Sequence, residues 1–380
     1  MAIKYQLRNK HLETLIEDLK LHMSNYDKHY NPVLEGERFH DIDFTKLLKI
    51  EKFITSVMMN KRRMYEERLP SPLAKDFDRL EISLFQKQPL RAVLKGRSEV
   101  FGIYLKTLFE VFARDVDHLF DESSPYTGGY HRNAHGQIFR MSGHTVEEKN
   151  ALNSAVDEFR ARIKLDEFKD KLDKENTKVR RRYDTAKTHL DDLFQKHGEL
   201  TFICLDLVFI KERRGGSLVL PLLEVPRSLT ADELQVFSTK LFRNGKNHHS
   251  LKDRAGFFQK WEYSLDKGRY SRCIFVYPTK LVADNDTLIE SLYNYWNDNI
   301  TDGAGSIHKA KLSKELKEFN KTYCTISKRE ENKIEQFKSR VLLYMTHIDQ
   351  YYKPLQLNDF SNLFNRSEGT VSVRESADDE

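Results

Sequence analysis

The amino-acid sequence predicts an α+β fold, in which a small antiparallel sheet with helices on one face follows a mainly helical N-terminal region. Two observations support this prediction. Up to about residue 198, apolar residues recur with the spacing of amphipathic helices. Beyond that point, apolar runs rich in β-forming residues alternate with helical patterns and surround one short hairpin. This alternation favours a layered domain of strands and helices.

The N-terminal region reads as helices joined by loops. Residues 44–59 and 100–120 each place apolar side chains three and four positions apart. The following stretch, 145–198, alternates acids and bases with few apolar residues, a pattern typical of one long or broken helix, or of two helices, with a solvated face. We therefore expect a helical domain over residues 1–144 and a charged helical connector over 145–198.

The C-terminal half is predicted to run strand, helix, strand, strand, helix, helix. These elements cover, in chain order, residues 200–210, 229–242, 257–265, 269–277, 285–299 and 332–352. The turn Asp266-Lys267-Gly268 is short enough to force its two strands to pair antiparallel. We expect residues 199–367 to form one domain, with the second face of its sheet open to a ligand. The polar tail, 368–380, is expected to be disordered.

Composition narrows the class of partner. The chain has 380 residues and a formal net charge of +5, which favours a polyanion such as DNA. No apolar run approaches the roughly 20 residues that span a bilayer, and the first residues do not resemble a signal peptide. The three cysteines are isolated, which is typical of free thiols in a reducing compartment. We predict a cytoplasmic protein without a membrane partner.

Five short motifs beyond Gly198 carry a resemblance to a known family. In chain order they are Cys204-Leu205-Asp206-Leu207, Lys260-Trp261-Glu262-Tyr263, Lys267-Gly268, Asn294-Tyr295-Trp296 with the following Gly303-Ala304-Gly305, and Tyr344-Met345-Thr346-His347-Ile348-Asp349-Gln350. In this order they resemble the C-terminal domain of YagK/YfjJ-type prophage proteins and of inovirus gene-two-like replication proteins. The resemblance implies a rolling-circle replication initiator scaffold of the His-hydrophobe-His (HUH) class.

The resemblance also implies a mechanism. In such enzymes two strand histidines and a nearby acid hold a divalent metal that offsets the charge developing on the scissile phosphate. A tyrosine on a C-terminal helix then attacks single-stranded DNA and keeps the phosphodiester energy in a covalent phosphotyrosine. The matching position for this nucleophile is Tyr344, and His347 stands where the family has a lysine.

The hairpin departs from the family at the two histidines. Tyr270 and Arg272 occupy those positions, and neither a neutral phenol nor a guanidinium is a suitable ligand for Mg²⁺ or Mn²⁺. Two interpretations of Arg272 remain open. Its guanidinium could take the place of the metal and hold a phosphate through paired hydrogen bonds. It could instead neutralise a core acid across the sheet, either Glu262 or Asp206.

Other side chains complete the candidate set. Tyr270, Arg272 and Trp261 are predicted to contact nucleic acid, the last by stacking on bases. The basic run Arg180-Arg181-Arg182 could follow a phosphate backbone from a helix. If the protein is an active nuclease, its metal site must be rebuilt, and the candidate ligands are Asp206, Glu262 and His248.

Three hypotheses of function follow. The first is a DNA-binding protein of phage or mobile-element origin on a degenerate initiator scaffold, without efficient nicking and with no cofactor, whose partner is single-stranded or origin-like DNA. The second is an active single-strand endonuclease and replication initiator that uses Mg²⁺ or Mn²⁺ with Tyr344. The third is a protein-interaction module that has lost DNA binding and uses its helical N-terminal half.

Overall fold

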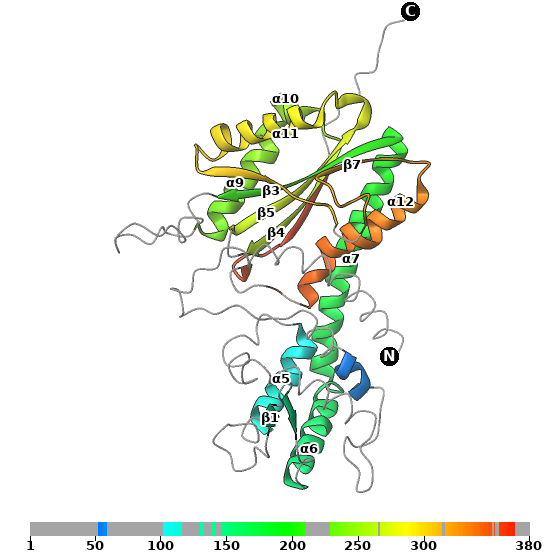
Figure 1. The fold of residues 1–380 in the computed structure, drawn as a ribbon, viewed down its shortest axis with the longest axis vertical. Helices are drawn as coiled ribbons and strands as arrows, with labels where there is room; N and C mark the ends of the chain where they lie inside the picture. The colour runs from blue at the N-terminus through cyan, green and yellow to red at the C-terminus, as the bar shows by residue number, and fades with distance from the viewer. Residues whose placement is uncertain are drawn as a thin grey trace, which may run out of the picture. The chain divides into compact units, whose positions relative to one another are not determined.

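The structure, a computed structural model, describes part of the chain in two compact units (Figure 1). The described residues are 52–58, 102–115, 130–132, 138–140, 146–209, 229–264, 267–313, 316–351, 353 and 357–368. Unit 1 comprises 1–16, 35–179 and 348–355, and unit 2 comprises 17–34, 180–347 and 356–380. The boundary falls within helix α7 (Asp166–His197). The tail predicted to be disordered lies outside the described residues, apart from its first position.

Unit 1 is built mainly from helices, as the sequence predicts. It contains α5 (Ile103–Asp115), α6 (Val146–Arg162) and the first part of α7, together with the hairpin β1 (Tyr130–Arg132) and β2 (Ile138–Arg140). Residues 52–58 are also helical. The ring centroids of Tyr104 on α5 and Phe168 on α7 lie 5.2 Å apart, and the Nε of Arg160 donates to the carbonyl of Val57 at 3.1 Å. The charged stretch 145–198 is thus two helices, broken at residues 163–165.

Unit 2 contains a six-stranded sheet whose pairings are all antiparallel. The order is β6-β3-β5-β4-β8, and β7 pairs with the free half of β3 beside β6. The strands are β3 (Glu199–Phe209), β4 (Gly256–Ser264), β5 (Gly268–Pro278), β6 (Gly305–Lys309), β7 (Tyr323–Ser327) and β8 (Phe364–Glu368). The predicted fold class is therefore confirmed, and β5 pairs with both β3 and β4 as expected.

The connections follow the split β-α-β-β-α-β pattern. Helix α9 (Ala231–Asn244) and the short α10 (His249–Lys252) lie between β3 and β4, and α11 (Asn285–Asn294) lies between β5 and β6. The sheet order of these four strands, fourth-first-third-second, is that of ferredoxin-like domains. Thr230 begins α9 with a capping box to Glu233, and Asp284 caps α11.

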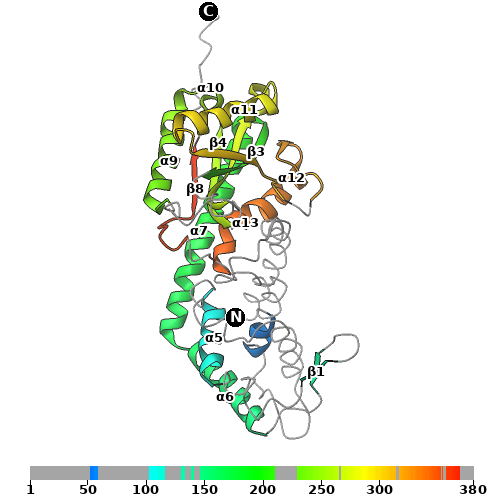
Figure 2. The same ribbon diagram turned by 60° about the vertical axis from the view of Figure 1, so that its left-hand side comes forward.

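Helices pack on both faces of the sheet (Figures 1 and 2). Odd-numbered side chains of β3 and β5 enter the main apolar core beneath α9, α10 and α11. Even-numbered ones face α7 and the last helical segment, where the Phe202 ring contacts Phe194 and Phe337. That segment comprises α12 (Glu331–Gln336), a π-helical stretch (Phe337–Leu342) and α13 (Leu343–His347). The open second face that we expected is therefore covered where the candidate site lies.

The turn from α11 into β6 explains one of the family-like motifs. A π-helical turn (Tyr295–Ile300) places the Trp296 ring edge-on against Phe209, with ring centroids 5.2 Å apart. Gly305 then begins β6 so close to Trp296 that a Cβ atom there would overlap the indole nitrogen. Gly303 has a φ of 74°, in the left-handed region that favours glycine. The two glycines thus let the chain reverse tightly beneath a large buried ring.

Candidate functional site

A buried network of charges lies at the centre of the sheet. Asp206 on β3 is in register with Arg272 on β5. The Nε and Nη2 of Arg272 donate to the two carboxylate oxygens of Asp206, at 2.9 and 3.2 Å. The Nη1 of Arg272 lies 3.4 Å from Oε2 of Glu262 on β4, the same oxygen that accepts from the Tyr270 hydroxyl at 2.6 Å. Lys267 Nζ adds a bond of 2.7 Å to Asp206. We call these five residues the charge network.

The network is enclosed by the fold. Asp206, Tyr270, Arg272 and Glu262 are each 5% exposed or less. Removing a carboxylate from water costs several kcal/mol, and only paired, well-directed hydrogen bonds offset that cost. The two-pronged contact between Arg272 and Asp206 provides such bonds. Arg272 thus bridges two carboxylates, as the second of our two interpretations required.

The ionisation of the network follows from its contacts. Burial raises the pKa of Asp206. The charges and hydrogen bonds of Arg272 and Lys267 lower it by more than burial raises it, so the pKa lies below its ordinary value. Burial alone would lower the pKa of Arg272, yet Asp206 and Glu262 hold it well above its usual range. Burial and then Glu262 raise the pKa of Tyr270 well above 10.0. At neutral pH the site thus contains the guanidinium of Arg272, the carboxylate of Asp206 and the neutral phenol of Tyr270.

Two lysines belong to this region that the sequence analysis did not single out. Lys260 on β4 is buried and in register with Arg272, and its even position on the strand was a usable signal because it shares a face with Glu262. Lys267 was considered only as a turn residue. Its contact with Asp206 depends on the register in which β5 pairs with β3, and the local sequence of the turn does not determine that register.

The proposed nucleophile lies on the same side of the sheet. Tyr344 on α13 is 7% exposed and lies near enough to Tyr270 to contribute to its raised pKa. His347, one turn later, is also buried; its Nδ1 lies 2.9 Å from the Thr346 hydroxyl, and its ring packs edge-on against Tyr183. The structure thus brings Tyr344 near the charge network, and places His347 against α7.

Three predicted roles conflict with the structure. Trp261 is 1% exposed within the main core, where its ring packs on Phe360, so neither ring face is available to a base. The proposed metal set also fails to assemble, because His248 caps α10 on one face of the sheet while Asp206 and Glu262 face the other. Among the described residues, no three His, Cys, Asp or Glu side chains are grouped so that they could hold a metal ion. Tyr270 and Arg272 are likewise too buried to contact nucleic acid directly in this state.

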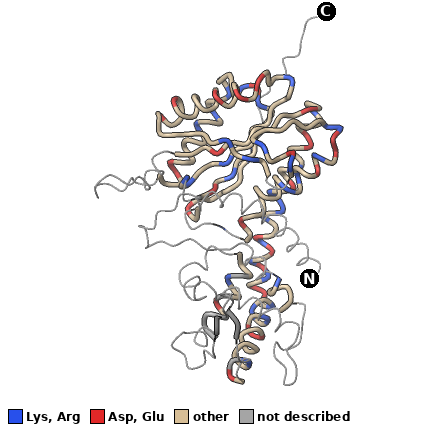
Figure 3. Tube along the Cα trace, in the orientation of Figure 1, with Lys and Arg blue, Asp and Glu red and all other residues tan. Residues whose placement is uncertain are grey.

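The basic run on α7 is better placed for a partner. Arg180 and Arg181 are exposed, and Arg180 pairs with Asp184 one turn later. Arg182 is half-buried and donates to Asn362 at 3.3 Å. Acids and bases are nearly balanced along the helix as a whole (Figure 3), so its net charge is small, although this run itself is basic. Two of the three arginines thus remain accessible to a phosphate backbone.

Comparison of the chain with models of protein families, with curated proteins and with solved structures finds no match. Within the part of the chain that the structure describes, no helix is both long enough and apolar enough to cross a membrane. The candidate site must therefore be judged on its own geometry.

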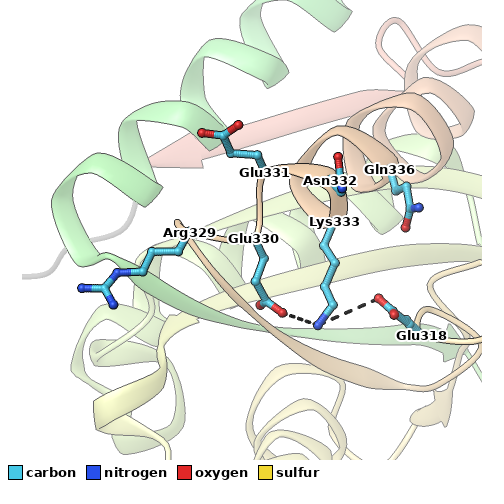
Figure 4. Close-up of a pocket in the computed structure, with 7 residues that line it drawn as sticks. All are labelled: Glu318, Arg329, Glu330, Glu331, Asn332, Lys333 and Gln336. Carbon is cyan, nitrogen blue, oxygen red and sulfur yellow. Dashed lines mark hydrogen bonds and ion pairs between the residues drawn. The ribbon is translucent and has the colours of Figure 1, made fainter.

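A surface pocket of about 510 Å³ lies beside α12 (Figure 4). Its lining is polar, and Lys333 within it pairs with Glu330 and lies 3.9 Å from Glu318. Specific small-molecule sites are usually lined mainly by apolar and aromatic side chains. The charges of Lys333, Glu330 and Glu318 offset one another, and we assign no ligand to this pocket.

Proposed function

We propose that this protein binds DNA through a domain of the replication-initiator type that has lost efficient nicking. The observation that carries the proposal is the contact of one guanidinium, that of Arg272, with the carboxylates of both Asp206 and Glu262. We further propose an origin in a phage or other mobile element, which rests on the resemblance alone.

The chemistry of the charge network supports the loss of nicking. A divalent metal in such a site would be held by carboxylate and imidazole ligands. Here Arg272 supplies a fixed positive charge, which the carboxylates of Asp206 and Glu262 already neutralise. A guanidinium cannot activate water or bind a phosphate while its donors are engaged in this way. The ion pair therefore takes over the structural role of a metal without its catalytic one.

DNA binding is supported by charge at the surface. The chain carries a formal net charge of +5, and accessible cations such as Arg181 stand outside the network. Contacts with phosphates release counterions, so affinity should fall steeply as salt rises. Because the described carboxylates of the network are paired internally, this binding should need no divalent cation.

The test compares binding and cleavage in one set of assays. Fluorescence anisotropy measures binding to labelled single-stranded DNA and to labelled duplex DNA. For each DNA, the affinity in EDTA should equal the affinity in Mn²⁺. A denaturing gel of the same mixtures should contain no protein–DNA adduct. A Mn²⁺-dependent adduct that disappears in Tyr344→Phe would overturn the proposal in favour of an active initiator. No binding to either DNA at low salt would favour the interaction module instead.

A further inference from the structure

Basic side chains gather at the end of the sheet where α7 meets β3. Lys196 lies in the last turn of α7, Lys280 lies in the 3-10 turn Thr279–Leu281 that follows β5, and Lys328 and Arg329 directly follow β7. The backbone N–H of Lys328 donates to the carbonyl of Gly198 at 2.6 Å, which fixes the turn after β7 against the junction of α7 and β3. We call these four cations the Gly198 cluster.

The register of the strands sets the spacing of the cluster. Ser327 of β7 pairs with Glu199, and Pro278 of β5 pairs with Leu200, so the turns that hold Lys328 and Lys280 flank β3 on opposite sides. Neighbouring strands lie about 4.8 Å apart, which puts the two turns on the order of 10 Å from each other. A row of cations of this width is suited to several consecutive phosphates rather than to one small anion.

The four cations are available to a partner. All four side chains are exposed, and none forms an ion pair with another residue that the structure describes. In Figure 4, Arg329 extends away from Lys333 and its carboxylates. Three exposed acids adjoin the group: Glu199 between its elements, Asp192 one turn before Lys196, and Glu331 two residues after Arg329.

The local field is positive. The pKa of His197 is lowered, first by burial and then by the charges of Lys196 and Lys280. The negative end of the α7 dipole accounts for a lysine in its last turn. It does not account for Lys280, Lys328 and Arg329, which come from two other elements. The cluster is therefore assembled by the tertiary fold.

We infer that the Gly198 cluster is the surface on which the backbone of a nucleic acid docks, an inference that rests on the proposed DNA binding. Cations from three elements can follow a chain of phosphates, and the cluster lies outside the buried charge network. An anionic membrane is the other polyanion to consider, but binding to its surface is strengthened by an apolar face that inserts among the lipids. The exposed apolar side chain next to Lys280 is a single leucine, Leu281, 46% exposed.

The test uses full-length variants with equal charge changes. Lys280→Glu with Lys328→Glu reverses two cations of the cluster, and Lys246→Glu with Lys252→Glu reverses two exposed lysines beside α10. The probe is a single-stranded DNA of about 30 nucleotides, longer than the site of a typical single-strand binding fold. Circular dichroism and thermal melting confirm that both variants fold.

The cluster variant should bind at least about tenfold more weakly than the control variant, and the slope of log affinity against log salt should fall by about 1.4, or 0.7 for each lost contact. Glu199→Gln should strengthen binding. Equal affinities and slopes for the two double variants would overturn the docking surface and leave the proposed function in place. Failure of the unmodified protein to bind would overturn the proposed function itself. Binding to vesicles of anionic lipid but not to DNA would assign the cluster to a membrane instead.

Discussion

Arg272 is held by two carboxylates at once, so its replacement should be among the most costly single changes in unit 2. Arg272→Met leaves Asp206 and Glu262 buried without their main cation, and we expect the free energy of unfolding to fall by about 3–5 kcal/mol. Urea denaturation followed by tryptophan fluorescence measures this loss. The control, Arg180→Met, removes an 84% exposed side chain and should change stability by no more than about 0.5 kcal/mol. If Arg272→Met lost no more stability than Arg180→Met, the network would contribute little.

The ion pair between Asp206 and Arg272 makes the stability of the protein depend on pH. The pKa of Asp206 is lower in the folded chain than its ordinary value of 3.8, so the unfolded chain takes up the proton first as pH falls. The stabilisation is therefore complete at neutral pH and is lost below about pH 4. Asp206→Asn should be less stable at pH 7 and should lose less on acidification than the unmodified protein. Asp232→Asn, at an exposed position of α9, is the control. An unchanged acid slope in Asp206→Asn would argue against the pair.

At the scale of single residues, the sequence could predict which residues form the site but not whether Arg272 binds a phosphate or a core carboxylate. It placed Tyr270 and Arg272 on one face of a strand, because side chains two apart share a side. The choice between a phosphate clamp and a core ion pair depends on the register of β3 against β5 and on what covers the face. Trp261 shows the same limit, because an exposed and a buried tryptophan on a strand have the same local pattern.

At the scale of elements, the turn before β6 depends on the missing side chain of Gly305. A methyl group there would overlap the indole of Trp296 and the hydroxyl of Thr301. Gly305→Ala should therefore destabilise unit 2 by about 1–3 kcal/mol through overpacking. Ser306→Ala, one residue further along β6 and half-buried, should stay within about 0.5 kcal/mol. Thermal melting monitored by tryptophan fluorescence distinguishes the two, and equal melting temperatures would contradict the proposed overlap.

Long elements with a clear apolar period were predictable, and short edge strands were not. The strand at 200–210, the hairpin and the helix entered through Thr230 all appear within a few residues of their expected bounds. β6 and β7 have five residues each and mixed burial, and β8 follows a segment without regular structure. Such strands are defined by the partner that they pair with rather than by their own pattern. The predicted helix at 332–352 contains a π-helical stretch that the spacing of its apolar residues did not predict.

At the scale of the whole molecule, the chain offers separate reporters for its two units. Both of its tryptophans, Trp261 and Trp296, lie in the core of unit 2. Tryptophan fluorescence therefore follows the sheet domain alone. Hydrogen exchange at α6 (Val146–Arg162) follows unit 1, because this helix lies wholly within it. The sequence predicted the change near residue 198 from a helical pattern to alternating strands and helices. It did not predict the division inside α7, because a continuous helix carries no local signal of a boundary between units.

If the two units unfold as separate cooperative bodies, a change in the charge network should affect one reporter and not the other. Arg272→Met should lower the fluorescence midpoint and speed amide exchange in β3 and β5, because these strands hold Asp206 and Arg272. Exchange in α6 should stay as in the unmodified protein, since its core is formed within unit 1. Hydrogen exchange measured by mass spectrometry on the full chain reports both regions in one experiment. Faster exchange in α6 to the same degree as in β3 would instead mean that the chain unfolds as one cooperative body.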